Sequence, residues 1–75
     1  MVSEEGYIVD LGVHIRQLRE RKGISQRNLA DMCNMPKTSI GRVERGEVSV
    51  TIRTLIKIAN ALEIEPKELL NFQMK

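Results

Sequence analysis

The stretch SQRNLADMCNMPKTSIGRVERG, residues 25–46, decides the fold. It begins with Ser25, a good helix N-cap because its hydroxyl accepts a backbone N–H that the first turn cannot otherwise satisfy. The apolar residues that follow share one helical face, and they are Leu29, Ala30 and Cys33. Pro36 ends this helix, because the residue before a proline disfavours helical backbone angles. The stretch therefore predicts two short helices, over about residues 26–33 and 37–44, joined by a tight turn.

The second of these helices combines an apolar inner face with short or basic outer side chains. Ile40 and Val43 lie three residues apart and hold the helix against the rest of the fold. The outer residues are Lys37, Thr38, Ser39, Gly41 and Arg42. A short helix, a tight turn and a second helix of this kind form a DNA-reading unit. Short side chains let such a helix enter a major groove about 12 Å wide, where Lys and Arg donate to base edges and phosphates.

Three further helices flank this unit. One is expected over about residues 9–22, from the apolar spacing of Leu11, Ile15 and Leu18. Another is expected over residues 52–62, with Thr51 as its cap. Its apolar arc is wide, so that helix is either central in the core or covered by a second subunit. A last short helix opens at Pro66, with two anchors, Leu69 and Leu70. No strand pattern occurs, and the predicted fold class is all-α, a compact five-helix bundle.

The length and composition exclude several classes of protein. Seventy-five residues make one domain, predicted over residues 11–75 with an N-terminal extension over residues 1–10. One Cys and one His cannot build a disulfide framework or a Cys/His metal site within one chain, so no metal and no cofactor are expected. Two aromatic residues argue against a reader that stacks single-stranded bases. No nucleophile–base pair is evident, and the chain is predicted not to be an enzyme.

The N-terminus carries no signal for export. It is acidic where a signal peptide is basic, and no apolar run approaches the roughly 20 residues of a membrane span. A single cysteine also fits a reducing compartment. We therefore expect a cytoplasmic protein without a membrane partner.

The net charge of +2 is unevenly distributed. Residues 16–57 carry ten basic and four acidic side chains, so this middle segment is +6. Residues 1–15 are −3 and residues 58–75 are −1. A basic centre between acidic ends is a localised electrostatic footprint, and it favours a polyanion as partner.

A set of motifs runs in register through all five predicted helices. They are Leu11-Gly12, Ile15-Arg16-x-Leu18-Arg19, Lys22-Gly23-Ile24-Ser25-Gln26, Leu29-Ala30, Ile40-Gly41-Arg42-Val43-Glu44-Arg45-Gly46, Thr54-Leu55-x-Lys57-Ile58-Ala59-x-Ala61-Leu62 and Pro66-x-Glu68-Leu69-Leu70. In these motifs residues 11–70 resemble the lambda-repressor-like helix-turn-helix family of the Cro-repressor (XRE) type. The resemblance implies a five-helix bundle that binds operator DNA as a dimer.

The resemblance also implies roles for single residues. The base readers it implies are Lys37, Thr38 and Arg42, and the chemistry of Ser39 makes it a fourth candidate. The candidate phosphate contacts are Gln26, Arg27, Arg45 and Arg53, of which Gln26 would also buttress the reading helix. Arg19 and Glu44 would form a buried ion pair between the first and third helices. An Arg or Lys that donates to O6 and N7 of guanine contributes roughly 1–3 kcal/mol of discrimination when the contact is bidentate.

The chain departs from the family pattern in four places. Asn34 stands where Gly is common, and Asn accepts left-handed backbone. Pro36 stands where a capping Ser or Thr is usual, which leaves the reading helix without a side-chain N-cap. Glu63 replaces a frequent Gly after the fourth helix, and the residues before Leu11 have no family counterpart.

Several apolar residues lie outside the apparent minimal core. One interpretation is that the termini fold back over a small core. The other, which we favour, is that these residues form the interface of a homodimer, because half-site readers usually pair. The predicted interface residues are Ile8, Val9, Ile58, Phe72 and Met74.

The leading hypothesis is a sequence-specific transcriptional regulator that binds double-stranded DNA. Two copies would place their third helices in successive major grooves of a pseudo-palindromic operator, with half-sites about 34 Å apart. This profile looks like a controller protein of a restriction–modification system or a small phage repressor, and we expect no small-molecule effector. The alternative is an antitoxin-type protein-binding partner of a toxin–antitoxin pair, with autoregulatory DNA binding. An enzyme is a distant third.

Overall fold

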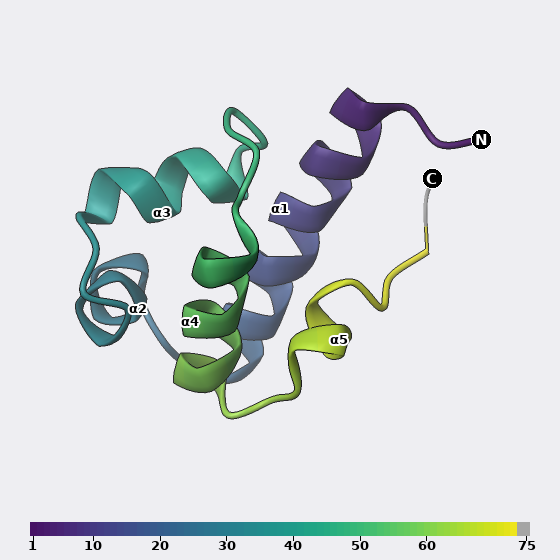
Figure 1. The fold of residues 1–75 in the computed structure, drawn as a ribbon. Coiled ribbons are helices and arrows are strands. Elements are labelled where there is room, and N and C mark those ends of the chain that lie inside the picture. Colours follow the sequence, from purple (N-terminus) through teal and green to yellow (C-terminus); the bar gives the residue numbers. More distant parts are fainter. Residues whose placement is uncertain (74–75) are drawn as a thin grey trace.

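This computed structural model describes residues 1–73, which contain five α-helices and no strand (Figure 1). In chain order they are α1 (Glu4–Arg21), α2 (Gln26–Met32), α3 (Lys37–Glu44), α4 (Ile52–Leu62) and α5 (Pro66–Leu69). The predicted all-α, five-helix fold is confirmed, and so are the predicted bounds of α3 and α4.

Hydroxyl side chains cap the N-termini of three of the helices. Oγ of Ser3 and Oγ of Ser25 each accept the backbone N–H three residues ahead, at 3.0 Å. Oγ1 of Thr51 does the same at 3.1 Å. Each bond satisfies a donor that has no partner within the first turn of the helix. The caps predicted at Ser25 and Thr51 are therefore confirmed, and they start α2 and α4.

Helix α1 begins at Glu4, well before the start predicted near residue 9. Ser3 supplies a cap that the apolar pattern does not reveal. Glu4 and Glu5 add negative charge to the first turn, where the helix dipole favours it. The helix start predicted near residue 9 is therefore wrong, and the boundary predicted between residues 10 and 11 lies inside a continuous helix.

The core is formed by the inward faces of all five helices. Its buried members are Leu11, Ile15, Leu29, Ala30, Cys33, Ile40, Val43, Leu55, Ile58, Ala59, Leu62 and Leu69. Burial raises the pKa of the Cys33 thiol, which suits a small core residue. Leu70, predicted as a second anchor of α5, is 42% exposed. That prediction is wrong because α5 ends at Leu69, and only Leu69 faces inward.

Helix α4 divides its wide apolar arc between the core and solvent. Leu55, Ile58 and Leu62 lie on the inward stripe, whereas Ile52 and Ile56 face outward with 69% and 44% of their surface exposed. Ile58 is fully buried, so it offers no surface to a second copy of the chain. Its assignment to a dimer interface is wrong, because the helical period places it against the core.

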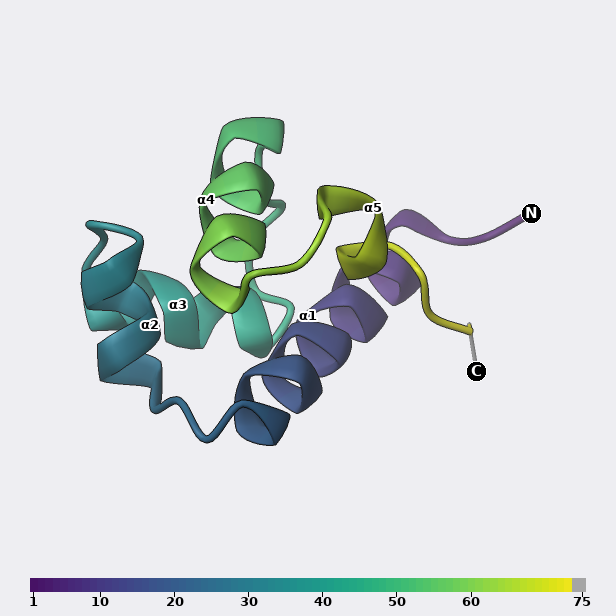
Figure 2. The ribbon, with the colours of Figure 1, turned by 90° about the horizontal axis from the view of Figure 1, so that it is seen from below.

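The C-terminal segment returns along α1. Figure 2 shows α5 between α4 and α1, with the chain beyond α5 continuing beside α1. The ring centroid of Phe72 lies 5.0 Å from that of Tyr7 and 5.3 Å from that of His14. Nε2 of His14 lies 2.8 Å from the carbonyl oxygen of Glu68. Phe72 therefore packs within its own chain, as the interpretation in which the termini cover the core requires.

The remaining predicted interface residues differ in exposure. Ile8 is partly buried and Val9 is 43% exposed. Met74 lies outside the described residues. Val9 is thus the most accessible of the predicted set within residues 1–73.

Helices α1 and α3 cross at close range. A Cβ atom on Gly12 would lie 2.4 Å from the carbonyl oxygen of Val43 and 2.6 Å from that of Glu44. Any larger residue would push the two helices apart, since a Cβ atom does not come this close to a carbonyl oxygen without a clash. The crossing fixes the C-terminal end of α3 on α1 and so determines which face of α3 points outward.

Candidate nucleic-acid interface

The turn between α2 and α3 is built around one left-handed residue. Asn34 has a φ of 57°, a conformation that Asn adopts more readily than most residues. Its N–H donates to the carbonyl oxygen of Asp31 at 3.1 Å, and the N–H of Met35 donates to that of Ala30 at 2.8 Å. These bonds close the end of α2 and lead the chain directly into α3. Asn34 therefore takes the backbone role that glycine has in the family pattern.

Helix α3 is held by its inner face and leaves its outer face free. It begins at Lys37 without a side-chain cap, as Pro36 predicted. Ile40 is fully buried and Val43 is 5% exposed. The outer face borders a shallow depression that is lined by Gln26, Lys37, Thr38, Gly41, Arg42, Arg45 and Glu47. The structure thus brings three predicted base readers together with two predicted phosphate contacts.

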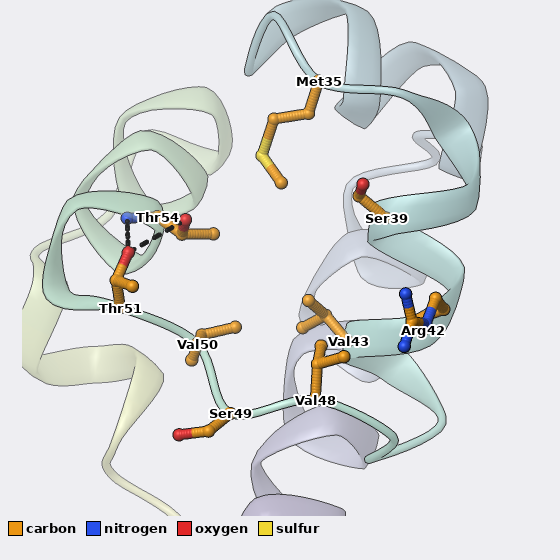
Figure 3. A pocket seen from close by; sticks show the side chains of 9 residues that line it. All are labelled: Met35, Ser39, Arg42, Val43, Val48, Ser49, Val50, Thr51 and Thr54. Atoms are coloured by element: carbon orange, nitrogen blue, oxygen red, sulfur yellow. Dashed lines mark hydrogen bonds between the residues drawn. The ribbon is translucent and has the colours of Figure 1, made fainter.

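Ser39 lies to one side of this face. It lines a second depression, between α3 and the segment that leads into α4, which Arg42 also borders (Figure 3). The other lining residues are apolar or carry hydroxyls, and they are Met35, Val43, Val48, Ser49, Val50, Thr51 and Thr54. Ser39 is partly buried, so it is the least accessible of the four predicted base readers.

The other two predicted phosphate contacts lie apart from the first depression. Arg27 is exposed in the first turn of α2, and Arg53 is exposed in the first turn of α4. Neither lines the depression beside α3. The structure leaves both side chains accessible but does not bring them to the centre of the site.

A buried ion pair joins α1 to the end of α3. Nε of Arg19 donates to Oε2 of Glu44 at 2.6 Å, and Nη2 donates to Oε1 at 3.0 Å. Nη1 of the same guanidinium donates to the carbonyl oxygen of Ile24 at 2.8 Å. The hydrogen bond that Arg19 donates to Glu44 raises the pKa of Arg19 above its ordinary value. The Arg19–Glu44 pair that the family resemblance implied is therefore present, and it removes the charge of Glu44 from the outer face of α3.

Gln26 connects this pair to the outer face. Its Nε2 donates to Oε1 of Glu44 at 2.9 Å. A side-chain amide nitrogen carries two hydrogens, so one can bind Glu44 while the second remains for an acceptor outside the protein. This geometry agrees with a residue that both buttresses α3 and contacts a phosphate.

Glu47 is a part of the site that the sequence reasoning did not identify. Its carboxylate oxygen Oε2 accepts a hydrogen bond from Nε of Arg45 at 2.6 Å, and Oε1 lies 3.9 Å from Nε of Arg42. The hydrogen bond from Arg45 lowers the pKa of Glu47 and raises that of Arg45. The only sequence signal is an acidic residue two positions after Arg45, beyond a glycine. Such a signal is too common to select a functional residue.

Among residues 1–73 no group of three His, Cys, Asp or Glu side chains is placed to hold a metal ion. In the same part of the chain, no helix is long and apolar enough to cross a membrane.

The fold and the outer face of α3 both lead to one family. Residues 15–69 match the family model HTH_3, described as helix-turn-helix. The chain belongs to this helix-turn-helix family. It is 39% identical over 62 residues to the control protein C.BamHI of Bacillus amyloliquefaciens, covering 81% of this chain and 76% of that one. It is 40% identical over 63 residues to the control protein C.SmaI of Serratia marcescens, covering 84% and 75%.

Solved structures of the family agree with this assignment. The restriction–modification controller protein C.AhdI of Aeromonas hydrophila superposes with a TM-score of 0.81 at 42% identity, covering 83% of this chain and 94% of that one. The wild-type restriction–modification controller protein C.Esp1396I superposes with a TM-score of 0.77 at 30% identity, covering 85% and 86%. The chain is therefore a DNA-binding transcriptional regulator, and its relatives are control proteins and not enzymes.

Proposed function

We propose that two copies of this chain bind a pseudo-palindromic operator and control transcription within a restriction–modification system. The assignment to a restriction–modification system rests on the relatives, because the chain covers three quarters or more of two control proteins and two restriction–modification controllers. The proposed operator binding rests on a single observation. The exposed face of α3 carries Lys37, Thr38 and Arg42 beside Arg45, on a helix that buried contacts hold in place.

The side chains on this face suit the major groove. Arg42 and Lys37 donate to the acceptors of guanine, and Thr38 either hydrogen-bonds a base or packs on a thymine methyl group. Arg45 and Gln26 bind phosphates on either side and fix the register of α3. These phosphate contacts supply much of the affinity and make it fall steeply with salt.

The dimer is needed because one α3 reads only one half-site. Two exposed apolar surfaces are candidates for the contact between copies. One is the outward face of α4, where Ile52 is 69% and Ile56 is 44% exposed, and the other is Val9 on α1, at 43%. Ile56→Glu and Val9→Glu place the same charge on the two surfaces, and sedimentation equilibrium measures which one abolishes the dimer. A wild-type protein that stays monomeric on a two-half-site duplex would contradict the proposed arrangement.

Footprinting on the DNA upstream of the protein's own gene tests the function directly. We expect two protected half-sites whose centres lie about 34 Å, or one helical turn, apart. Loss of protection in excess scrambled duplex, or the same affinity for every sequence, would refute operator reading. Expression of a reporter from that upstream DNA then distinguishes regulation from binding without effect.

A further inference from the structure

The end of α3 fixes the backbone of Glu47 over Arg42. The N–H of Glu47 donates to the carbonyl oxygen of Arg42 at 2.9 Å, and the N–H of Gly46 donates to that of Val43 at 3.1 Å. Gly46 has a φ of 71°. These two bonds with a left-handed glycine form a Schellman motif, which closes a helix and reverses the chain. The chain therefore returns along α3, and Glu47 does not continue its helical period.

Helix α1 holds this turn from behind. A Cβ atom on Gly46 would lie 2.7 Å from Cα of Val9 and 2.8 Å from its Cγ2. The turn is thus packed directly on the backbone of α1. The position of Glu47 follows from the packing of the fold and does not depend on a flexible loop.

The carboxylate of Glu47 contacts two guanidinium groups of the site. It accepts from Nε of Arg45 at 2.6 Å and from Nη2 of Arg45 at 3.4 Å. On its other side it lies 3.9 Å from Nε of Arg42. The side chains of Arg42 and Glu47 are 57% and 48% exposed, so all of these groups remain accessible to a ligand. Because the contact to Arg42 is made at Nε, the two Nη groups at the far end of that guanidinium stay available as a pair of donors.

We propose that Glu47 is a positioning residue for base reading by Arg42. The inference rests on the proposed function, in which Arg42 reaches a base in the major groove. A carboxylate 3.9 Å from Nε favours rotamers that keep the Arg42 guanidinium beside Glu47, so less side-chain freedom is lost when its Nη groups bind O6 and N7 of guanine. The same negative charge repels the phosphates of every duplex, so it lowers affinity for operator and scrambled DNA alike. Glu47 therefore raises selectivity through the positioning of Arg42, which favours only DNA that offers a matching base.

Glu47→Gln and Glu47→Asp separate these two effects. Glu47→Gln removes the charge, so we expect operator binding to weaken about threefold, as an exposed ion pair suggests, while binding to scrambled duplex tightens. Glu47→Asp keeps the charge but is one methylene shorter, so operator binding weakens and scrambled binding stays unchanged. Glu65→Gln is the matched control, since it removes an exposed carboxylate at the start of α5 and should move neither affinity.

A double-mutant cycle with Arg42→Ala tests whether Glu47 acts on operator affinity through Arg42. In the Arg42→Ala background, Glu47→Gln should no longer weaken operator binding, because the side chain that it positions is gone. Fluorescence anisotropy with operator and scrambled duplexes measures all affinities at one salt concentration, and circular dichroism verifies that each variant melts near the wild-type temperature.

Three results would overturn the role of Glu47 and leave the proposed function intact. Equal tightening on both duplexes in Glu47→Gln would reduce Glu47 to a repulsive charge. An operator loss that persists in the Arg42→Ala background would mean that Glu47 acts on DNA independently. Unchanged affinities in both variants, with wild-type preference for the operator intact, would refute the positioning role alone. A wild-type protein without preference between the two duplexes would overturn the proposed function as well.

Discussion

Replacement of Arg19 by Met should strand a buried charge and destabilise the fold. The side chain of Glu44 is 2% exposed, and that of Arg19 is 10% exposed. Arg19→Met keeps most of the length and apolar packing of the side chain but removes both donors to Glu44. Only Gln26 then remains as a partner of that carboxylate. Breaking a buried pair by removal of one partner costs about 3–5 kcal/mol.

This magnitude is large for so small a domain. A chain of this length has a free energy of unfolding of about 4–11 kcal/mol, from typical values per residue. Arg19→Met should therefore remove about a quarter or more of the free energy of unfolding and lower Tm by at least about 10 °C. Urea denaturation followed by circular dichroism at 222 nm measures the free energy, and a constant m-value shows that the native state is unchanged.

The double variant Arg19→Met/Glu44→Leu is the decisive control. It replaces the pair by apolar side chains, an exchange that is often neutral, so most of the lost stability should return. In the double variant Gln26 has no carboxylate to which its Nε2 can donate, so its side chain is no longer oriented. Operator binding should therefore weaken although the fold is stable. A loss below about 1 kcal/mol in the single variant would refute the reasoning. A double variant as unstable as the single one would attribute the loss to packing and not to the stranded charge.

Three further outcomes are expected. Arg42→Ala should lose about 1–3 kcal/mol of preference for one base pair in competition binding while scrambled duplex is still bound, and equal loss on every sequence would make Arg42 a phosphate contact. Gly46→Ala should destabilise the fold by about 2–4 kcal/mol in thermal melts, because it combines a left-handed φ with a clash against Val9, and a Tm within error of wild type would contradict this. The carboxyl of Glu47 should titrate below its ordinary pKa by NMR and return toward it in Arg45→Ala. The contact with Arg45 is thus present above that lowered pKa and is lost as pH falls through it.

Features with local causes were predictable from the sequence. Ser25 caps α2 whatever the rest of the chain does, and Asn34 accepts a left-handed φ for reasons that lie within its own side chain. The same reasoning missed the start of α1, because the apolar pattern does not extend to its first turn and only the N-cap Ser3 indicates where the helix begins. An apolar stripe indicates where a helix touches the core but not where it begins.

Features that depend on tertiary packing were less predictable from the sequence. The wide arc of α4 indicated either a central helix or a covered one, and α4 turned out to place Ile58 in the core and Ile56 outside. That choice is set by the rotation of α4 against its neighbours, which periodicity does not determine. Glu44 was paired with Arg19 only through the family resemblance, since 25 residues separate them. Glu47 was missed because a left-handed glycine, and not helical spacing, brings it to Arg42 and Arg45.

Glu44 and Glu47 show how one turn gives two nearby carboxylates opposite tasks. In a continuous helix, residues three apart share a face, so Glu47 would lie beside Glu44 and add a second negative charge to the buried pair with Arg19. The turn at Gly46 instead directs Glu47 to the outer face, where it meets Arg42 and Arg45. The buried carboxylate then holds α3 in place through Arg19 and Gln26, while the exposed one is proposed to orient Arg42 for reading DNA. Because one backbone turn separates these tasks, a variant such as Gly46→Ala should impair selectivity even under conditions where the domain remains folded.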